Sequence, residues 1–283
     1  MRLLVHDDLP SLPAGRVFRH SPVAGFALLA IVGLPAVGVA CCAQRIGASF
    51  EALPWFFWVV GGPLMFMGFL LWLLVLQTAS HAAQSGLLAT NWVLRVAPSG
   101  CAIQLRSFRN SHFPRDVPTV LWLESGEIRC ARRVQETGWI ASSKGRRLVR
   151  SSWLELELQG VDCAPIEMRL AQERAEQGPP IRVLGIKTRT RFNDTPAFFV
   201  RPGVLRVEWL GAGMLAALRE TTEIAPDLKV DLDQELGTQL EPRVKAYCDR
   251  GWQIAAHALV QRERGLSWSE AKKFVEEVGR KAA

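Results

Sequence analysis

The sequence lacks the groupings of side chains that most catalytic and metal-binding sites require. Its five histidines are isolated from one another, and its six cysteines show no pair at the spacing of metal ligands. It contains no Gly-x-Ser-x-Gly segment for a serine nucleophile and no glycine-rich loop with the lysine that would bind phosphate. Glu155 and Glu157 resemble a pair of acids, but an exposed strand explains their alternation more simply. We therefore expect a protein that is not an enzyme and that binds no metal and no cofactor.

Two long stretches lack charge altogether. Residues 20–44 and 52–94 contain no Asp, Glu, Lys or Arg, and residues 22–43 and 54–77 within them are mostly apolar. A helix of about 20 apolar residues crosses the roughly 30 Å of hydrocarbon in a bilayer, so we predict a hairpin of two transmembrane helices over residues 22–77. Small residues and prolines would shape the packing between the two helices. They are Gly33, Pro35, Gly61, Gly62, Pro63 and Gly68.

The distribution of arginines indicates an orientation for this hairpin. Arg2, Arg16 and Arg19 precede the first span, whereas Arg45 stands alone in the link between the spans. Basic residues near the ends of spans favour the cytoplasm, so we expect both termini to be cytoplasmic in a multi-pass protein of the bacterial inner membrane. A cleaved lipoprotein signal is the alternative interpretation, but a branched apolar residue is expected three positions before the modified cysteine, and Gly38 stands there before Cys41.

Residues 91–209 follow a pattern of period two, which is typical of strands. About seven short antiparallel strands followed by helices predict a β-barrel or β-sandwich over residues 85–220, and thus an α+β soluble part. In the first hairpin, a loop of even length sets Trp92, Leu94 and Val96 beside Cys101, Ile103 and Leu105 on one apolar face. The other face then carries Arg95, Gln104 and Arg106 and is expected to be polar. The other predicted strands cover residues 119–124, 127–134, 151–160, 165–171, 181–188 and 198–209, with a short helix at 213–220.

The C-terminal part has a different pattern. Residues 221–237 are acidic and weakly patterned, and we interpret them as a linker. Residues 238–283 are predicted to form a helical module, in which Gly265 ends one helix and Ser267 with Glu270 begins the next as a capping box. The division is therefore a cytoplasmic N-terminal tail (1–21), the transmembrane hairpin (22–77), the β-rich domain (85–220), the linker and the helical module.

Two resemblances to known families rest on particular segments. The segments NWVLRVAPSGCAIQLRSF, PTVLWLESGEI and VLRVEWLGAGMLAALRE, after a two-span hairpin, resemble bacterial membrane proteins with a cytoplasmic pleckstrin-homology-like domain. That resemblance implies an adaptor or assembly role rather than catalysis. Relatives that bind phosphoinositides use a basic loop between the first strands. Here that loop is APSG, which has no Lys or Arg, so headgroup recognition is not implied.

The second resemblance is local. The segment GLSWSEAKKFVEEV (265–278) is similar to the helix-turn-helix that ends the ribosomal stalk protein. Ala258 and Gln261 stand where that family presents basic residues to translation factors, so ribosome binding is not implied. The matching residues are Gly265, Leu266, Glu270, Ala271, Lys272, Val275 and Glu276.

A basic cluster is the remaining candidate for a binding site. Residues 85–218 contain 19 Lys and Arg against 12 Asp and Glu, whereas residues 219–283 contain 11 against 12. Basic residues bracket a predicted loop at 136–144 and are candidates for contact with anionic lipid, and Trp139 with Ile140 is a candidate interfacial anchor. The basic residues are Arg129, Arg132, Arg133, Lys144, Arg146, Arg147 and Arg150.

These observations predict a scaffold, assembly or regulatory domain for a membrane complex. Its expected partners are the lipid bilayer and a membrane protein or a second copy of the chain, and nucleic acid is an unlikely partner. The alternative hypothesis is a sensor or binder of anionic lipid headgroups that acts through the basic loop.

Overall fold

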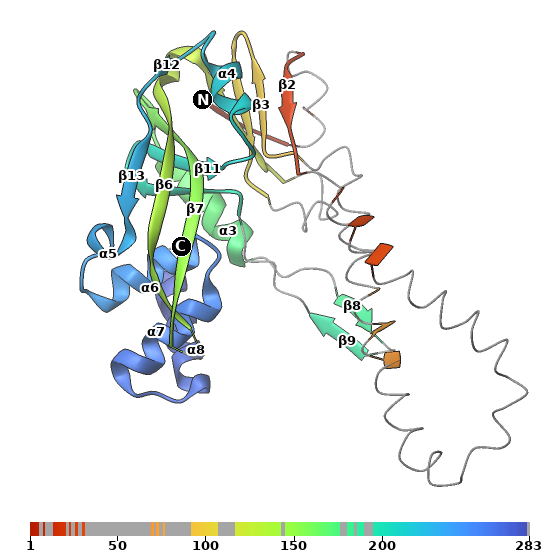
Figure 1. The fold of residues 1–283 in the computed structure, drawn as a ribbon. Helices are drawn as coiled ribbons and strands as arrows, with labels where there is room; N and C mark the ends of the chain where they lie inside the picture. The colour runs from red at the N-terminus through yellow and green to blue at the C-terminus, as the bar shows by residue number, and fades with distance from the viewer. Residues whose placement is uncertain are drawn as a thin grey trace, which may run out of the picture. The chain divides into compact units, whose positions relative to one another are not determined.

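The structure is a computed structural model of the chain. It describes residues 1–5, 8, 14–20, 92–106, 117–142, 145–175, 180–183, 186–189 and 195–281, together with separate positions between 23 and 76. The chain divides into two units, one of residues 1–19, 92–181 and 188–283 and one of residues 20–91 and 182–187. The first unit contains nearly all of the described elements (Figure 1).

A five-stranded antiparallel sheet forms one part of this unit. Its order is β1 (Arg2–Leu4), β5 (Val120–Glu124), β4 (Gly100–Gln104), β3 (Leu94–Ala97) and β2 (Arg16–Phe18). The predicted N-terminal tail therefore supplies both edge strands. Leu3 and Phe18 explain this difference, because they pack against the main hydrophobic core and so hold two three-residue strands that are too short to show a period.

The register predicted for the first hairpin is confirmed. Leu94 lies opposite Ile103 and Val96 lies opposite Cys101, across a two-residue turn. The second face of this hairpin is not open to water, however, because Ala102 is buried with Trp122 in a separate small apolar cluster. Trp92 belongs to this second cluster and not to the apolar face predicted for it. Residues on both faces of β4 are thus buried.

The second sheet has six strands and is built around one long hairpin. Strand β6 (Ile128–Ser142) follows the short 3-10 helix η5 (Ser125–Glu127) and pairs with β7 (Gly145–Leu158). On one side, β7 pairs with β11 (Val204–Glu208), which pairs with β10 (Ala197–Arg201). On the other side, β6 pairs in parallel with β12 (Glu223–Ile224) and β13 (Leu228–Asp231).

Residues 221–237, which we predicted to be a linker, belong to this sheet. They contain β12, β13 and the short helix α5 (Leu232–Glu235). Two apolar side chains attach them, because Ile224 packs against the main core and Leu232 is buried beside Gly138. Leu228, Val230 and Leu232 alternate with charged residues, which is a short strand signal that we overlooked in an acidic segment. That alternation does not indicate that the strand pairs with β6.

The prediction of a strand at residues 165–171 is wrong, since these residues lie in helix α3 (Ala164–Ala175). Ile166, Met168 and Leu170 are spaced two residues apart, as in a strand, whereas Ile166 and Leu170 are also four residues apart, as on one face of a helix. Ile166, Leu170 and Glu173 are buried at helical spacing, whereas Met168, which a strand would place beside Ile166, is 56% exposed. The helical face was selected because it packs against the core.

The main core lies between the two sheets. Residues such as Ile103 and Leu121 from the first sheet contact Leu154 and Leu205 from the second, and α3 and α4 (Gly213–Leu218) close the sides. Strands β8 (Pro180–Val183) and β9 (Ile186–Arg189), predicted as one strand, form a two-stranded sheet of their own.

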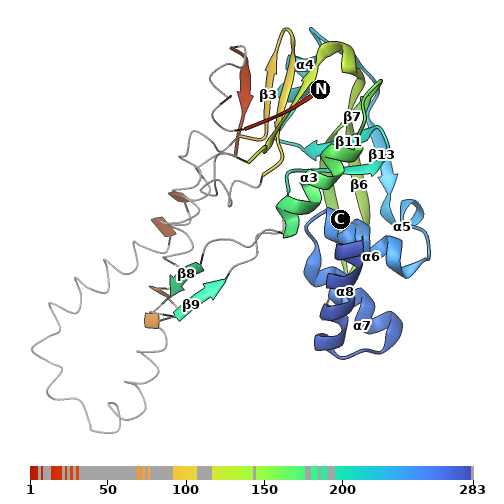
Figure 2. The ribbon, with the colours of Figure 1, turned by 180° about the vertical axis from the view of Figure 1, so that it is seen from behind.

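A second core holds the C-terminal helices α6 (Leu240–Asp249), α7 (Gln253–Arg264) and α8 (Trp268–Lys281) against the far half of the β6–β7 hairpin. Figure 2 shows these helices on one face of the hairpin. The predicted helix signals are confirmed. Gly265 has a φ of 65°, and the Glu270 carboxylate accepts a hydrogen bond from the Ser267 N–H at 2.9 Å.

The predicted membrane architecture is contradicted. Among the described residues, no helix combines the length and the apolar composition that crossing a bilayer requires. Helix α8, whose 14 residues make it the longest helix with described bounds, carries charged residues on most of its surface and is far short of about 20 apolar residues. This finding contradicts the expectations of a transmembrane hairpin and of a multi-pass inner-membrane protein. Most of residues 22–77, including all of the glycines and prolines proposed to pack the spans, lie outside the described residues.

We predict that Gly138→Ala will weaken the attachment of α5 to β6. A Cβ atom at position 138 would lie 2.5 Å from the Cβ atom of Leu232, which is too close for any side chain to accept without a backbone shift. We expect a loss of about 1–3 kcal/mol in the free energy of unfolding, measured by urea denaturation. The matched control is Gly126→Ala, where no atom lies within 4 Å. Equal losses in the free energy of unfolding for the two variants would contradict the close packing of Leu232 against Gly138.

Candidate functional site

Buried acidic and basic side chains of the six-stranded sheet, with the partly exposed Arg132 and Glu235 and with Arg250 from the helices, form one connected cluster, which we call the ionic cluster. Each charged side chain in it contacts at least one of opposite charge, and the three carboxylates balance the three guanidinium groups. Its members are Glu136, Glu155, Glu235, Arg132, Arg206 and Arg250.

Glu136 is at the centre of the ionic cluster and is almost fully buried. Its carboxylate accepts hydrogen bonds from Arg250 Nε at 3.1 Å, from Trp153 Nε1 at 2.7 Å, from Ser151 Oγ at 2.9 Å and from Arg206. Burial by itself would raise the pKa of this carboxyl group, but the hydrogen bonds and charge of Arg250, with the charge of Arg206, hold the pKa below its ordinary value. Glu136 is therefore ionised and fully bonded at neutral pH.

Arg250 connects the helices to the sheet through this cluster. It follows α6, and its guanidinium group lies 5.0 Å from the ring centroid of Phe198 in β10 and 5.9 Å from that of Trp252. It also bonds the carboxylate of Glu235 at 3.2 Å. The acids and bases of the cluster are thus used to join α5, α6 and the sheet, and we assign them a structural role.

A second buried ion pair fixes helix α3. The guanidinium group of Arg106 donates two hydrogen bonds of 3.0 Å to the carboxylate oxygens of Glu173. Arg169, one turn before Glu173, bonds the same carboxylate. Arg106, which we expected on an open polar face of the first hairpin, is instead buried at the end of that hairpin.

Two of the cysteines are poor nucleophiles. Burial raises the pKa of the Cys101 thiol to about 12. Burial, reinforced by the charge of Asp249, raises the pKa of the Cys248 thiol to about 11. Because the thiolate is the reactive form, neither side chain is set up for catalysis at neutral pH.

The far end of the β6–β7 hairpin extends beyond the other strands of the sheet. Strand β11 pairs with β7 only from Trp153 onward, and β13 pairs with β6 only as far as Thr137. Residues 138–142 and 145–152 therefore form a two-stranded ribbon, which we call the hairpin tip. Helices α6–α8 cover one face of it, where Ile140 and Val149 are buried (Figures 1 and 2).

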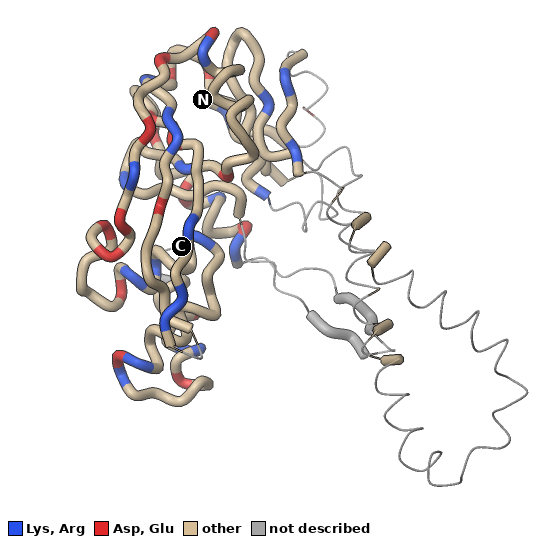
Figure 3. The backbone as a smooth tube through the Cα atoms, viewed as in Figure 1, with Lys and Arg blue, Asp and Glu red and all other residues tan. Residues whose placement is uncertain are grey.

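The opposite face of the hairpin tip is open around Trp139 and Leu148, whereas Ala141 farther along the same face is buried with the helices. Trp139 and Leu148 are cross-strand partners on this face, and they are 50% and 40% exposed. Arg146 and Arg150, two residues before and after Leu148, share this face because side chains alternate along a strand, and both are exposed. Figure 3 shows the Lys and Arg positions along this part of β7. The tip thus presents an apolar pair between two arginines.

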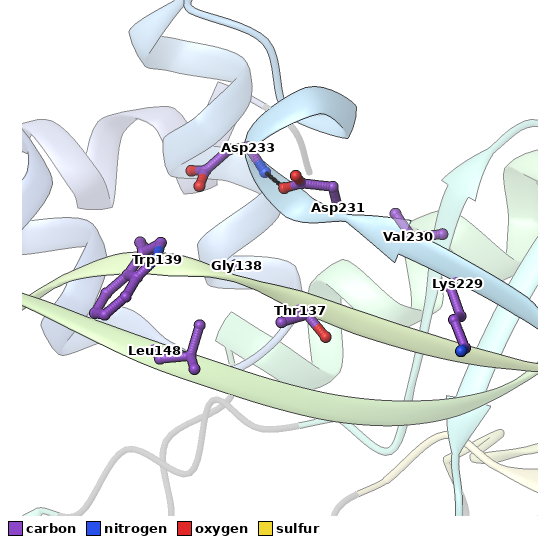
Figure 4. A pocket seen from close by; sticks show the side chains of 8 residues that line it. All are labelled: Thr137, Gly138, Trp139, Leu148, Lys229, Val230, Asp231 and Asp233. Carbon is purple, nitrogen blue, oxygen red and sulfur yellow. Dashed lines mark hydrogen bonds between the residues drawn. The ribbon is translucent and has the colours of Figure 1, made fainter.

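A shallow hollow of about 380 Å³ adjoins this apolar pair on the side of β13 (Figure 4). Its floor is formed by Trp139 and Leu148 with Thr137 and Gly138. Its wall is formed by residues of β13 and α5, and Asp231 there accepts a hydrogen bond from the Asp233 N–H at 2.9 Å. The remaining residues that line it are Lys229, Val230 and Asp233.

The structure divides the predicted basic cluster into two groups. Arg129 pairs with Glu157 at 2.6 Å, Arg132 belongs to the ionic cluster, and Arg133 lies 5.2 Å from the ring centroid of Trp209. Each of these three therefore already has a partner, and Arg132 lies five residues before Thr137, or about 17 Å along β6.

The remaining predicted residues lie at the hairpin tip or outside the described residues. Arg146, Arg147 and Arg150 are exposed at the tip, whereas Lys144 lies outside the described residues. Of the candidate anchor, Trp139 is on the open face, but Ile140 is buried under the helices and does not belong to the surface.

Sequence reasoning missed Leu148 and the residues of the hollow. We placed a loop at 136–144, but both strands continue almost to position 143. Arg146, Leu148 and Arg150 alternate with their neighbours as a strand requires. This alternation extends the predicted strand at 151–160 back to residue 146 and would have indicated a longer hairpin. No sequence signal would have placed β13 beside this hairpin, because the pairing joins segments about 95 residues apart.

Comparison of the chain with protein-family models, with curated proteins and with solved structures finds no match. The two resemblances noted from the sequence accordingly stay predictions.

We predict that Glu136→Gln will destabilise the fold by about 3–5 kcal/mol, because Arg206 and Arg250 would lose their shared buried counter-charge. The folded-state pKa of Glu136 is lower than its ordinary value of 4.5, so the stability it contributes is present above about pH 4.5 and is lost as the pH falls through the folded-state pKa. Urea denaturation should therefore show a difference between wild type and variant that narrows below pH 4.5.

The matched control for this prediction is Glu220→Gln, because Glu220 is exposed. Its free energy of unfolding should stay within about 0.5 kcal/mol of wild type at every pH. A Glu136→Gln variant as stable as wild type at pH 7 would show that the ionic cluster does not hold the sheet and helices together.

Proposed function

We propose that the protein is a non-catalytic scaffold that binds a partner protein through the open face of its hairpin tip. The observation that carries the proposal is the exposed pair Trp139 and Leu148, which lies between Arg146 and Arg150 on a ribbon braced from behind by helices. A rigid surface with an exposed tryptophan next to arginines has the composition of the energetically important centre of many protein interfaces.

The size of the apolar pair is consistent with one part of an interface. The exposed portions of Trp139 and Leu148 amount to roughly 200 Å², and burying them would contribute about 5 kcal/mol at about 25 cal/mol per Å². Association costs at least 4 kcal/mol in lost freedom, so the pair alone supports only weak binding. The flanking arginines supply the charge that would add orientation and selectivity.

The buried acids and bases support a role without catalysis. In the ionic cluster, Glu136 and Glu155 are bonded to Arg206, and in the second buried pair Glu173 is bonded to Arg106. Their hydrogen-bonding capacity is spent within the fold, so they are not free to transfer a proton to a substrate. The proposal keeps the scaffolding role expected from the sequence and omits the membrane tether.

Anionic lipid headgroups are the second candidate ligand for this surface. Arg146 and Arg150 on the open face favour it, since each basic residue near an anionic surface contributes about 1 kcal/mol. Two observations favour a protein instead. Asp231 and Asp233 line the hollow on the side of β13 and would be repelled by a broad anionic surface that covers the whole face, although not by a segment confined to the edge of β7. Ile140 is buried and cannot enter a bilayer.

Site-specific photo-crosslinking in living cells tests the proposal. With benzoylphenylalanine in place of Leu148 in the full chain, we expect a discrete protein adduct whose yield falls at least tenfold when Arg146→Glu and Arg150→Glu are added. The matched control position is Met168 in α3, which is 56% exposed and far from the tip in sequence. It should produce no adduct of the same mass.

A second control separates the site from general charge effects. Lys272→Glu with Lys273→Glu changes the charge by the same amount on exposed residues of α8 and should leave the adduct at position 148 unchanged. Adducts of equal yield at positions 148 and 168, or an adduct that survives reversal of the tip arginines, would contradict the proposal. Crosslinking to lipid instead of protein would establish the second candidate.

A further inference from the structure

The geometry points to strand addition as the binding mode: we propose that an acidic, extended segment of a partner protein pairs with the free edge of β7 over residues 146–150. This inference rests on the proposed function and specifies the partner's chemistry. On one face of the partner strand, an apolar side chain would lie between two acidic side chains, and the three residues would be spaced two positions apart.

The backbone of β7 is open at the hairpin tip. From Gly145 to Ser152, its backbone hydrogen bonds run to β6, and in the described part of the chain none runs to another segment. In an antiparallel pair, alternate residues direct both the N–H and the C=O away from the partner strand. Those of β7 are thus presented along an edge that can accept a further strand.

The side chains along this edge define what the added strand must carry. Arg146, Leu148 and Arg150 alternate on the open face, so the two guanidinium groups originate about 13 Å apart with Leu148 between them. Side chains directly opposite one another on neighbouring strands interact, and opposite charges there are favourable. An added strand therefore matches when acids lie opposite the arginines and an apolar residue lies opposite Leu148.

A second copy of this chain does not meet that requirement. If two hairpin tips paired in an antiparallel direction about Leu148, Arg146 of one copy would lie opposite Arg150 of the other. If they paired in a parallel direction, Arg146 of one copy would lie beside Arg146 of the other, and Arg150 beside Arg150. Like charges directly opposite one another destabilise a sheet, so the edge rejects its own copy and selects an acidic partner.

Peptide binding to the full-length protein tests the inference by fluorescence anisotropy. The matched peptide has the sequence Thr-Glu-Thr-Val-Thr-Glu-Thr, and the control, Thr-Thr-Glu-Val-Glu-Thr-Thr, has the same composition and charge with the acids on the other face. We expect the matched peptide to bind at least tenfold more tightly. Equal affinities would overturn the inference, because register would then have no role.

Backbone methylation tests for strand pairing directly. We expect N-methylation of one alternate set of residues in the matched peptide to reduce binding at least tenfold and N-methylation of the other set to be tolerated. This alternation arises because only every second N–H of an added strand faces β7. Binding that tolerates both sets would mean that charge alone holds the peptide, and strand addition would be wrong.

Charge exchange tests the two arginines. Arg146→Glu with Arg150→Glu should weaken binding of the matched peptide at least tenfold, and a peptide with lysines in place of the glutamates should bind this variant as the matched peptide binds wild type. The control variant Lys272→Glu with Lys273→Glu should bind like wild type. Failure of the lysine peptide to restore binding, with the variant folded by circular dichroism, would overturn the assignment.

The outcomes separate this inference from the proposed function. A protein adduct at position 148 without binding of the matched peptide would overturn strand addition and leave the scaffold role in place. Binding of the matched peptide without a protein adduct in cells would support the strand-pairing chemistry and count against the scaffold role. Sedimentation of the protein with phosphatidylserine vesicles that is lost in the Arg146→Glu, Arg150→Glu variant but unaffected by excess matched peptide would assign these arginines to lipid and overturn the inference.

Discussion

A buried carboxylate in the middle of a sheet is unfavourable unless opposite charges neutralise it, and Glu136 of β6 is in that position. The charges come from Arg206 in β11 and from Arg250 after α6. Arg206, Trp153 and Ser151 of the sheet supply some of its hydrogen bonds, and Arg250 completes the set, so this side chain links the C-terminal helices to the sheet. The helices are consequently held against the far half of the hairpin, where they bury Ile140 and Val149.

This arrangement leaves part of the hairpin uncovered. The hairpin of β6 and β7 is longer than the strands on either side, so its tip has an open face and an open edge. The helices leave Trp139 and Leu148 exposed on the face opposite to Ile140 and Val149. A braced ribbon of this kind is preorganised, so a binding partner does not meet the cost of ordering it.

The parts of the fold that could be predicted are those where local pattern and tertiary packing agree. The register of the first hairpin followed from the alternation of its apolar residues, and the start of α8 followed from Ser267 and Glu270. The apolar residues of 165–171 fit both the spacing of a strand and the spacing of a helix. The segment is a helix because that conformation places Ile166 and Leu170 together in the core. The apolar pattern at residues 22–77 predicted membrane spans, and the described helices contradict that architecture.

The sequence by itself determined the local elements and the chemical character of the chain: short strands, capped helices and a surplus of arginine. Only the tertiary structure decided which arginines are available. Arg132 and Arg146 are alike in sequence context, yet one is neutralised by Glu155 and the other is exposed at the hairpin tip. The physical reason is that ion pairing depends on contacts between distant segments. Glu136 meets Arg250 across 114 positions of the chain, a separation at which sequence patterns carry no information.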